Sequence, residues 1–574
     1  MKILVLVKQI PEISKITFDK STGRINREGV PLIMNSFDKR AVEEAIRIKE
    51  RDSSTVMVAS MGPPQAADVL DEALRMGADR AFLVSDRKFG GSDTWATSAI
   101  LSSLINKIRP DLVLAGKYSL DGETSQVPPQ IAQMIGFNFV SGASKIEFME
   151  KSVRIEQDYE SGIRTVETTL PLLISVSEKI NRARKIDENV PSMKEKIELE
   201  TAESIPSKIS GIENSLTVVD GTEIISMEKV AEMVTMDRAF ELIKDHLNAP
   251  SEDLSVKKVE MKGETKNGMV LGISLDDPST SLQIASKIHE IASGSGKETL
   301  MVGNVNPEML KGMTANKYIH LRGGDVFAIA DFISDIIINR KPEFVVFPSN
   351  STGRDVAGYV SAKLSLGLTA DCIDLVWKDG KLVQYKPAFG GGVVARILSK
   401  TKPEMTTVRP GIFKIKRTDS PFELEEKELK NSERVRLISD DHVESKFIPL
   451  QSAKIILCIG RGVKGKSTVD HIVELAQKLG IAVAGTRPVV DMRLLPRQQQ
   501  IGITGLSVSP DLYIGIGVSG MDNHVMGIRY AKTVIGINND SEAAIFHHAD
   551  YGVLGNAEDF VEHLSNLVND KDSH

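Results

Sequence analysis

Cysteine is almost missing from this chain of 574 residues, because Cys372 and Cys458 are the only two. Each lies inside an apolar segment, where we expect a small core residue, and neither belongs to a CxxC motif or a cysteine–histidine cluster. The sequence therefore predicts no disulfide framework and no thiolate metal site. The adjacent His547 and His548 would point to opposite faces of a strand and lack a third ligand, so we expect no metal.

The sequence also lacks a basic excess and a long apolar run. Its formal net charge is -7, which gives no positive field for nucleic acid or for an anionic membrane. No stretch approaches the roughly 18 apolar residues of a membrane span. The apolar run that begins at Ile3 ends before Lys8 and is too short for a signal peptide. These absences predict a cytoplasmic protein that neither enters a membrane nor binds nucleic acid.

What the chain does have is an ordinary globular composition, with 41% apolar and 26% charged residues, and a length that suits about three domains. Strand and helix patterns alternate from the first residues. They place strands at 3–7, 55–59, 80–84 and 111–115, and helices at 37–51, 67–76 and 94–108. This alternation predicts a parallel sheet covered by helices, with an antiparallel excursion between residues 140 and 177.

The same pattern starts again after a polar stretch, which predicts an internal duplication. RPDLVLAGKYSLDGETSQV in the first half corresponds to KPEFVVFPSNSTGRDVAGYV in the second, and Gly353 follows Gly122 by 231 residues. A hairpin with its turn at Asp379-Gly380 and a charged segment at 419–446 come next. We expect a nucleotide-binding domain at 1–250, a linker at 251–266, a related domain at 267–445 and a third domain at 446–574.

The third domain gives the clearest indication of a ligand. Between Lys454 and Asp550, apolar runs end in glycine-rich or polar turns, as in a doubly wound sheet with a nucleotide across its strand ends. GRGVKGKS, from Gly460 to Ser467, matches both a dinucleotide fingerprint and an NTPase phosphate loop. No acidic Mg²⁺ ligand ends a neighbouring strand, and Thr486-Arg487 stands where the fingerprint expects an acid, so a P-loop NTPase is a remote alternative.

Several motifs, in order, resemble the electron transfer flavoproteins. GRG, AVAGTRPVVD, QIGITG, VSGMDNH, INND and IFHHADYGVLG resemble the FAD-binding domain of the alpha subunit. TGRDVAGYVSAKLSLGLTAD, PAFGGG and TTVRPGIF resemble the domain that precedes it, whereas VKQIP, MNSFDKRAVEEAIRIKE, MGPPQA and MGADRAFLV resemble the beta subunit. The resemblance implies both subunits fused in one chain, beta first. The fold would be two related Rossmann-like domains plus a flavodoxin-like FAD-binding domain, in a monomer that mimics the heterodimer.

The resemblance also implies which residues hold FAD in the third domain. They are Arg461, Thr486, Arg487, Gln500, Ile501, Gly502, Ile503, Thr504, Ser519, Gly520, Met521, Asp522, Asn523, His524, Asn538 and Asp550. Arg487 and His524 would supply positive charge and donors near N1 and O2 of the flavin. The Thr504 hydroxyl would face N5, and Ser519-Gly520 would face the phosphates or the ribityl chain. Ile503 replaces the glutamine that is common in the family.

A second nucleotide is implied in the first half. The loop DGETSQV follows the family pattern DGxTxxV of members that hold a second FAD there, in place of AMP. A capped helix start is the alternative reading of this loop. We prefer a second FAD to AMP. The expected contacts are Leu6, Asn35, Met61, Asp121, Gly122, Thr124, Gln126 and Val127, with Leu6 and Val7 beneath the adenine.

The family resemblance implies a redox carrier without a substrate pocket of its own. FAD would accept electrons from dehydrogenases of the acyl-CoA type and pass them singly to an electron transfer flavoprotein–quinone oxidoreductase. Val190 and Met193 are candidate anchors for the dehydrogenase. The alternative is an NADH-oxidising, electron-bifurcating flavoprotein that uses the second FAD.

Overall fold

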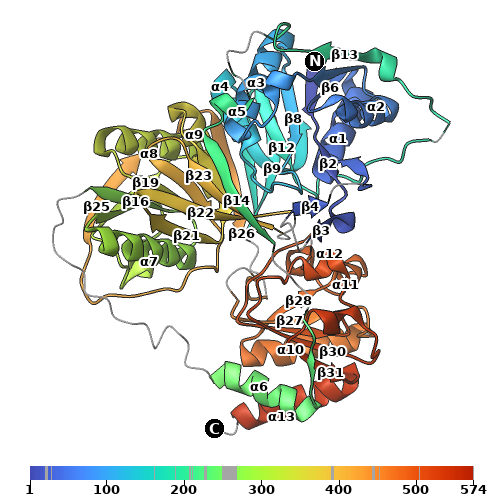
Figure 1. The fold of residues 1–574 in the computed structure, drawn as a ribbon, viewed down its shortest axis with the longest axis vertical. Coiled ribbons are helices and arrows are strands. Elements are labelled where there is room, and N and C mark those ends of the chain that lie inside the picture. Colours follow the sequence, from blue (N-terminus) through green and yellow to red (C-terminus); the bar gives the residue numbers. More distant parts are fainter. Residues whose placement is uncertain are drawn as a thin grey trace.

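The computed structural model describes residues 1–19, 24–26, 29–160, 162–187, 189–205, 209, 211–224, 229–248, 268–389, 393–442, 447–450, 453–502 and 505–572. Figure 1 shows three lobes: the first half in blue and cyan, the second half in olive and yellow, and the C-terminal domain in orange and red. The predicted linker at 251–266 lies outside the described residues. Within the described ranges, no helix has both the length and the apolar character to cross a membrane.

The first half is built on one sheet. Its strands from this half are β1 (Lys2–Leu6), β6 (Thr55–Met61), β7 (Arg80–Val84), β8 (Leu112–Gly116), β9 (Asn138–Phe148), β10 (Val153–Tyr159), β11 (Gly162–Thr168), β12 (Leu172–Val176) and β13 (Ile197–Glu200). The central strands β1, β6, β7, β8 and β12 are largely buried and apolar. Its helices are α1 (Ser36–Asp52), α2 (Ala67–Met76), α3 (Thr94–Ile108), α4 (Val127–Ile135) and α5 (Gly211–Asn214). Two short ladders, β2 (Gln9–Pro11) with β5 (Leu32–Met34) and β3 (Thr17–Asp19) with β4 (Arg24–Asn26), precede α1.

The second half repeats this plan. Its main strands are β16 (Met269–Ser274), β17 (Glu298–Gly303), β18 (Lys317–Gly323), β19 (Phe344–Pro348), β20 (Leu368–Cys372), β24 (Glu404–Val408) and β25 (Glu423–Leu429). Its helices are α7 (Pro278–Ser295), α8 (Val326–Arg340) and α9 (Ser351–Leu364). The predicted hairpin is confirmed as β21 (Asp374–Lys378) and β22 (Lys381–Ala388), followed by β23 (Val393–Ser399).

The strand order confirms the duplication. The first sheet contains the run β7-β6-β1-β8-β12, and the second contains β18-β17-β16-β19-β24, so equivalent strands occupy equivalent places. The halves meet through α4 and α9, where the Gln130 amide donates to the Ser361 hydroxyl at 3.1 Å. Those two residues are themselves 231 positions apart, which is the sequence offset of the repeat.

Each half lends a strand to the other. β26 (Val435–His442) follows the second half but pairs antiparallel with β11, at the end of the ten-stranded sheet. In return β14 (Thr217–Ile224) leaves the first half and pairs with β23 in a four-stranded sheet. Two edge strands, β25 and β26, thus lie within the charged segment that precedes the predicted boundary near residue 445. This exchange ties the halves into one unit.

The C-terminal domain is a six-stranded sheet ordered β15-β31-β30-β29-β27-β28. Its strands are β15 (Glu232–Met233), β27 (Ile455–Ile459), β28 (Ala482–Gly485), β29 (Leu512–Ile516), β30 (Thr533–Asn538) and β31 (Tyr551–Leu554). Its helices are α6 (Met236–Asn248), α10 (Lys466–Leu479), α11 (Arg487–Asp491), α12 (Asp522–Val525) and α13 (Ala557–Asp572). β15 and α6 come from the end of the first half, so residues 232–248 complete this domain, as Figure 1 shows beside α13. The predicted fold class is confirmed.

Candidate functional site

Four loops meet at the carboxyl edge of the six-stranded sheet. Thr486 follows β28, Ser519 follows β29, Asn538 ends β30, and Arg461 lies in the turn after β27. Parallel strands carry such positions to one edge, which gathers residues that are far apart in the sequence. The Asn538 amide donates to the carbonyl of Val518 at 2.9 Å and links two of the loops. Most of the residues predicted to bind FAD therefore share one edge.

The glycines of GRGVKGKS have a packing role that the sequence did not reveal. The loop after β27 crosses the loop after β29, where Gly460 N–H donates to the Ile516 carbonyl at 2.8 Å and Gly462 N–H donates to the Gly517 carbonyl at 3.0 Å. A Cβ at Gly460 would lie 2.1 Å from the Gly517 oxygen, so a side chain does not fit there. The close crossing of the two loops is therefore sufficient reason for glycine at both positions, and a phosphate-binding role is not needed to explain them.

The turn that begins at Gln500 lies against the start of α12. Gln500 is fully buried, and Ile501 N–H donates to the Gly485 carbonyl at 3.1 Å, which fixes the turn to the end of β28. Gly502 has φ +134°, and a Cβ there would stand 2.7 Å from the Asn523 oxygen. Only glycine permits this approach of two backbones. The structure thus brings the predicted turn and the predicted helix start together.

Some predicted contacts of this region are not located. Ile503 and Thr504 lie outside the described residues, and so does the side chain of Asp522. The hydroxyl expected at flavin N5 and the departure at Ile503 therefore stay predictions. Beside them, Asn523 is exposed and Met521 is 67% exposed.

His524 is buried and neutral. Its Nε2 lies 2.7 Å from the Tyr513 hydroxyl and its Nδ1 lies 3.2 Å from the Ile501 carbonyl. A carbonyl only accepts, so Nδ1 carries the proton and Nε2 accepts from Tyr513. Burial lowers the pKa of His524 to about 4. In this arrangement the positive charge expected from the sequence comes from Arg487 alone.

Acidification is expected to destabilise the C-terminal domain through His524. The unfolded side chain takes up a proton below its ordinary pKa of 6.5, whereas the folded one stays neutral down to about 4. The stabilisation is therefore complete above pH 6.5 and is lost as the pH falls toward 4, by about 2 kcal/mol at pH 5. Urea unfolding at pH 8 and pH 5, followed by flavin fluorescence, measures this loss. In His524→Gln the free energy of unfolding should fall between pH 8 and pH 5 by that much less than in the wild type. The same pH dependence in both proteins would contradict a buried, neutral His524.

Arg487 lies on the face of the C-terminal domain that is turned toward the first half. Its side chain is 65% exposed and its Nε stands 3.3 Å from Asp491 Oδ2. Burial lowers the pKa of Arg40 on α1, and the nearby charges of Arg497 and Arg487 contribute to that shift. Arg497 in turn lies 3.7 Å from Glu178 of the first half. Positive charge from both domains gathers here, which suits an electron-rich ring.

Asp550 is not brought together with the other predicted residues. It precedes β31, at the amino edge of the sheet, where its carboxylate accepts from Val534 N–H at 2.8 Å. The same carboxylate pairs with Lys229 at 2.7 Å. Asp550 therefore fastens the segment before β15 to the sheet, on the side opposite Asn538.

The residues at the carboxyl edge fit FAD. The Thr486 hydroxyl is buried and has no hydrogen-bond partner among the described residues. Buried polar groups are normally hydrogen-bonded, so a bound ligand is the expected partner of this hydroxyl. Gly520 has φ +81° and lets the Ser519 loop pass directly over Ile545, whose N–H donates to the Ser519 carbonyl at 3.1 Å. Thr486, Arg487 and the Ser519 loop would hold the cofactor, and FAD would supply the redox chemistry.

The predicted second site lies at the point where the strand order of the first sheet reverses, between β1 and β8. Leu6 ends β1 and Met61 ends β6, while the loop after β8 carries Asp121. The Asn35 amide donates to the Tyr118 carbonyl at 2.9 Å and accepts from Leu120 N–H at 3.3 Å, so it shapes this loop. Gly122 and Thr124 are half-buried along the same loop.

Gln126 faces the second half instead of this edge. Its amide donates to the Leu368 carbonyl at 3.1 Å, and its oxygen accepts from the Thr94 hydroxyl at 2.5 Å. Its side chain is 2% exposed, so both ends are used inside the protein. Val127, the next residue, begins α4 and is half-buried.

Sequence reasoning missed two residues at this edge. Lys8 Nζ pairs with Asp121 at 2.7 Å. The Asp38 carboxylate accepts from Lys8 N–H at 2.8 Å and from Gly116 N–H at 3.1 Å, and burial raises its pKa to about 7. Asp38 thus holds the ends of β1 and β8 beside each other. A charged residue directly after a buried strand, such as Lys8, was the signal available in the sequence.

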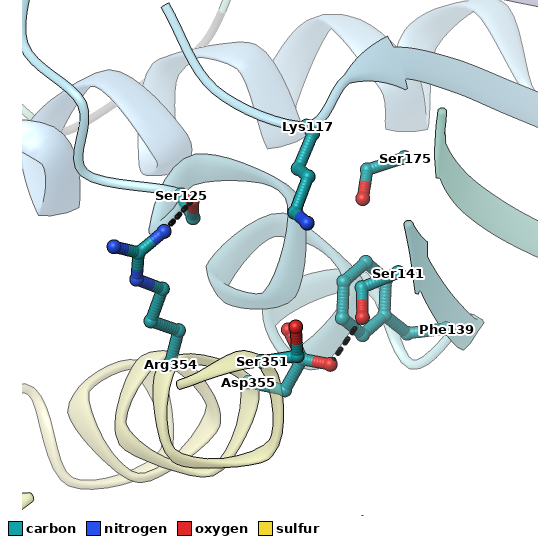
Figure 2. A pocket seen from close by; sticks show the side chains of 8 residues that line it. All are labelled: Lys117, Ser125, Phe139, Ser141, Ser175, Ser351, Arg354 and Asp355. Carbon is teal, nitrogen blue, oxygen red and sulfur yellow. Dashed lines mark hydrogen bonds between the residues drawn. The ribbon is translucent and has the colours of Figure 1, made fainter. Parts of the chain in front are cut away.

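A small polar cleft lies between strands of the first half, near Ser125, and helix α9 of the second half. Figure 2 shows the side chains that line it, namely Lys117, Ser125, Phe139, Ser141, Ser175, Ser351, Arg354 and Asp355. Burial raises the pKa of Asp355 to about 7, and its carboxylate accepts from the Ser141 hydroxyl at 2.5 Å. The cleft therefore lies where α9 of one half meets the nucleotide loop of the other.

Together the fold and the carboxyl edge define a class of protein. It has two copies of a Rossmann-like domain, which exchange strands, and a third parallel sheet with a dinucleotide site at its carboxyl edge. The chain belongs to the electron transfer flavoprotein family. The family described as "Electron transfer flavoprotein domain" matches residues 22–203 and 309–434, and "Electron transfer flavoprotein FAD-binding domain" matches residues 449–529.

Relatives of both subunits match this one chain. The electron transfer flavoprotein subunit beta of Thermoanaerobacterium thermosaccharolyticum is 37% identical over 261 residues, which are 43% of this chain and 98% of the relative. The subunit alpha of the same organism is 31% identical over 320 residues, 52% of this chain and 94% of the relative. Subunit CarD of the caffeyl-CoA reductase-Etf complex of Acetobacterium woodii is 45% identical over 186 residues, 32% of this chain and 71% of the relative. The predicted order, beta before alpha, is confirmed.

Proposed function

We propose that this chain is an electron carrier. FAD in the C-terminal domain accepts electrons from flavin dehydrogenases and passes them on one at a time. The observation that carries the proposal is the carboxyl edge of the C-terminal sheet, where Thr486, Arg487 and the Ser519 loop converge in a segment that the FAD-binding family matches. The fused chain takes the place of the heterodimer, and we assign it to the cytoplasm as a monomer.

The proposed donors are dehydrogenases of the acyl-CoA type. One relative is named as a subunit of a caffeyl-CoA reductase-Etf complex, which favours a CoA-linked flavin enzyme as the partner. The proposed acceptor is an electron transfer flavoprotein–quinone oxidoreductase. The proposed domain ranges are 1–250, 267–445 and 446–574, with β14 and β15 pairing with strands outside the first of them.

We further propose that the first half holds a second FAD in preference to AMP. Gly122 carries no side chain at the loop, and a Cβ there would meet nothing closer than 3.6 Å, so the loop leaves its backbone accessible. The DGETSQV pattern supports the larger ligand. With a second FAD, NADH would be the donor, and its electrons would divide between two acceptors. Bifurcation is the second candidate function.

Reductive titration without oxygen separates the two functions. A simple carrier is expected to be bleached by a substrate-reduced acyl-CoA dehydrogenase and to be indifferent to NADH, because only the FAD of the C-terminal domain then takes electrons. Bleaching of one flavin by NADH is expected of the bifurcating protein. Absorbance of the flavin is the measurement. A protein that neither donor reduces would contradict both functions.

The segment that carries the two candidate anchors for the dehydrogenase, Val190 and Met193, is partly fixed in the structure. Met193 N–H and the Ser192 hydroxyl donate to Asp71 Oδ1 at 2.5 and 3.0 Å, and Met193 packs against the core of the first half. Val190 is half-buried and, within the described part of the chain, does not pack against this core as Met193 does, so we propose it as the main anchor. Val190→Ser is expected to slow transfer from acyl-CoA dehydrogenase about tenfold, as loss of a buried apolar anchor does. Stopped-flow reduction measures this rate, and an unchanged rate would remove Val190 from the proposal.

A further inference from the structure

The loop of the proposed second nucleotide site is held from two sides. Its first part, from Tyr118 to Leu120, is held by the first half, because the Asn35 amide donates to the Tyr118 carbonyl and accepts from Leu120 N–H. Its second part is held by the second half. The division falls near Asp121, whose carbonyl accepts from Phe389 N–H at 3.0 Å.

The second part of the loop has an unfavourable backbone. Glu123 has φ 50° and Ser125 has φ 55°, and both are in the left-handed region that residues with a side chain rarely adopt. Such residues persist where surrounding contacts impose them. Two contacts reach this part of the loop from the second half: Arg354 lies beside the Ser125 hydroxyl, and the Gln126 amide donates to the Leu368 carbonyl.

Arg354 on α9 is the centre of those contacts. Its Nη1 lies 3.5 Å from the Ser125 hydroxyl, as Figure 2 shows, and its Nε donates to the Ser349 hydroxyl at 3.0 Å. Its Nη2 lies 3.5 Å from Asp371 Oδ1. One guanidinium thus joins the loop to the ends of β19 and β20.

A buried ion cluster fixes the position of Arg354. Arg409 donates to Asp371 through Nε at 3.1 Å and also through Nη2. Burial alone would raise the pKa of Asp371, but the Arg409 and Arg354 charges hold it below its usual value. Asp371 therefore stays ionised and keeps both arginines in place. The Arg409 guanidinium also lies 5.1 Å from the centre of the Tyr530 ring, in the C-terminal domain.

We propose that Arg354, held by Asp371 and Arg409, is a positioning residue that sets the loop at residues 121–126 for nucleotide binding in the first half. The second half is then a structural part of a site that it does not line directly. This inference rests on the proposed second nucleotide. The hydrogen bond from the Gln126 amide to the Leu368 carbonyl has the same role, because it also holds the loop against the second half.

The test is Arg354→Gln in the full chain, with Lys363→Gln as the matched control. Lys363 lies on the same helix and loses the same charge, but its ion pair with Asp331 at 2.6 Å is remote from the loop. AMP and FAD are titrated separately into protein stripped of its second nucleotide. Arg354→Gln is expected to raise the Kd of the bound nucleotide about tenfold, the value of one charge-assisted bond. Lys363→Gln should keep the wild-type Kd, and both variants should keep the FAD of the C-terminal domain.

Two further readouts separate positioning from general stability. Amide hydrogen exchange at residues 122–126 in the stripped protein is expected to rise in Arg354→Gln and not in Lys363→Gln. Ser125→Gly in the Arg354→Gln background is expected to recover part of the affinity, because glycine adopts the left-handed conformation without a steric cost. An unchanged Kd and unchanged exchange in Arg354→Gln would overturn the positioning role alone. A wild type that takes up neither AMP nor a second FAD would overturn the second site, and this inference with it.

Discussion

Gly520→Ala is expected to yield protein without flavin in its C-terminal domain. A Cβ at this position would lie 2.1 Å from Ile545 N and 2.4 Å from Ile545 Cα. The loop that carries Ser519 must therefore move away and break the bond from Ile545 N–H. Overpacking together with φ +81° is expected to cost about 3 kcal/mol. The FAD released per chain on denaturation, with the thermal midpoint, measures the effect.

Gly480→Ala is the matched control for this experiment. Gly480 has φ +76°, nearly that of Gly520, but an added Cβ would meet no heavy atom within 4 Å. It ends α10 in the same domain, so the substitution carries only the left-handed cost of about 1 kcal/mol. We expect it to keep its flavin. Full FAD content in Gly520→Ala would show that the Ser519 loop does not hold the cofactor.

Phe240→Ala is expected to destabilise the C-terminal domain by about 3 to 4 kcal/mol. Phe240 lies on α6, is 8% exposed, and packs its ring 5.1 Å from that of Phe560 and 5.2 Å from that of His563. Its loss would leave a cavity between α6 and α13 and free the segment that the first half contributes. Urea unfolding followed by flavin fluorescence measures the change in midpoint.

Arg238→Ala is the control that tests whether the loss of stability in Phe240→Ala comes from lost packing of the side chain. Arg238 lies on the same helix, and its ion pair with Glu241 is exposed on both sides. Exposed pairs contribute little, so we expect Arg238→Ala to keep the wild-type urea midpoint. If Phe240→Ala unfolded at the wild-type urea concentration, residues 232–248 would not be a working part of the domain.

Most of the fold followed from periodicity in the sequence. The helix predicted at 67–76 and the strand predicted at 80–84 are α2 and β7 with the same bounds, because buried parallel strands are continuous apolar runs and their covering helices are amphipathic. The duplication followed from one repeated loop. Both signals are local, and local patterns determine where an element begins and ends.

The strand exchange did not follow from the sequence. β14 and β26 are largely exposed edge strands, and an alternating pattern does not say which sheet edge will accept a strand. For the same reason the charged segment at 419–446 indicated only a domain boundary near residue 445, and β25 and β26 within it were not foreseen.

Parts of the candidate site also depend on contacts that the sequence does not encode. The neutral state of His524 comes from its burial, and its tautomer is set by Tyr513 and the Ile501 carbonyl, which reach it from other elements. Asp550 belongs to a strong motif but stands at the amino edge, since it precedes its strand. Family motifs indicate that a site exists, and only the packed structure shows which members of a motif reach it.

The identity and number of nucleotides released by heating the purified chain test the proposed carrier most directly. We expect two nucleotides per chain, FAD from the C-terminal domain and a second FAD from the first half. Release of FAD and AMP in equal amounts would agree with the electron-carrier function but would contradict a second FAD in the first half. Release of no flavin at all would contradict the proposed electron-carrying function.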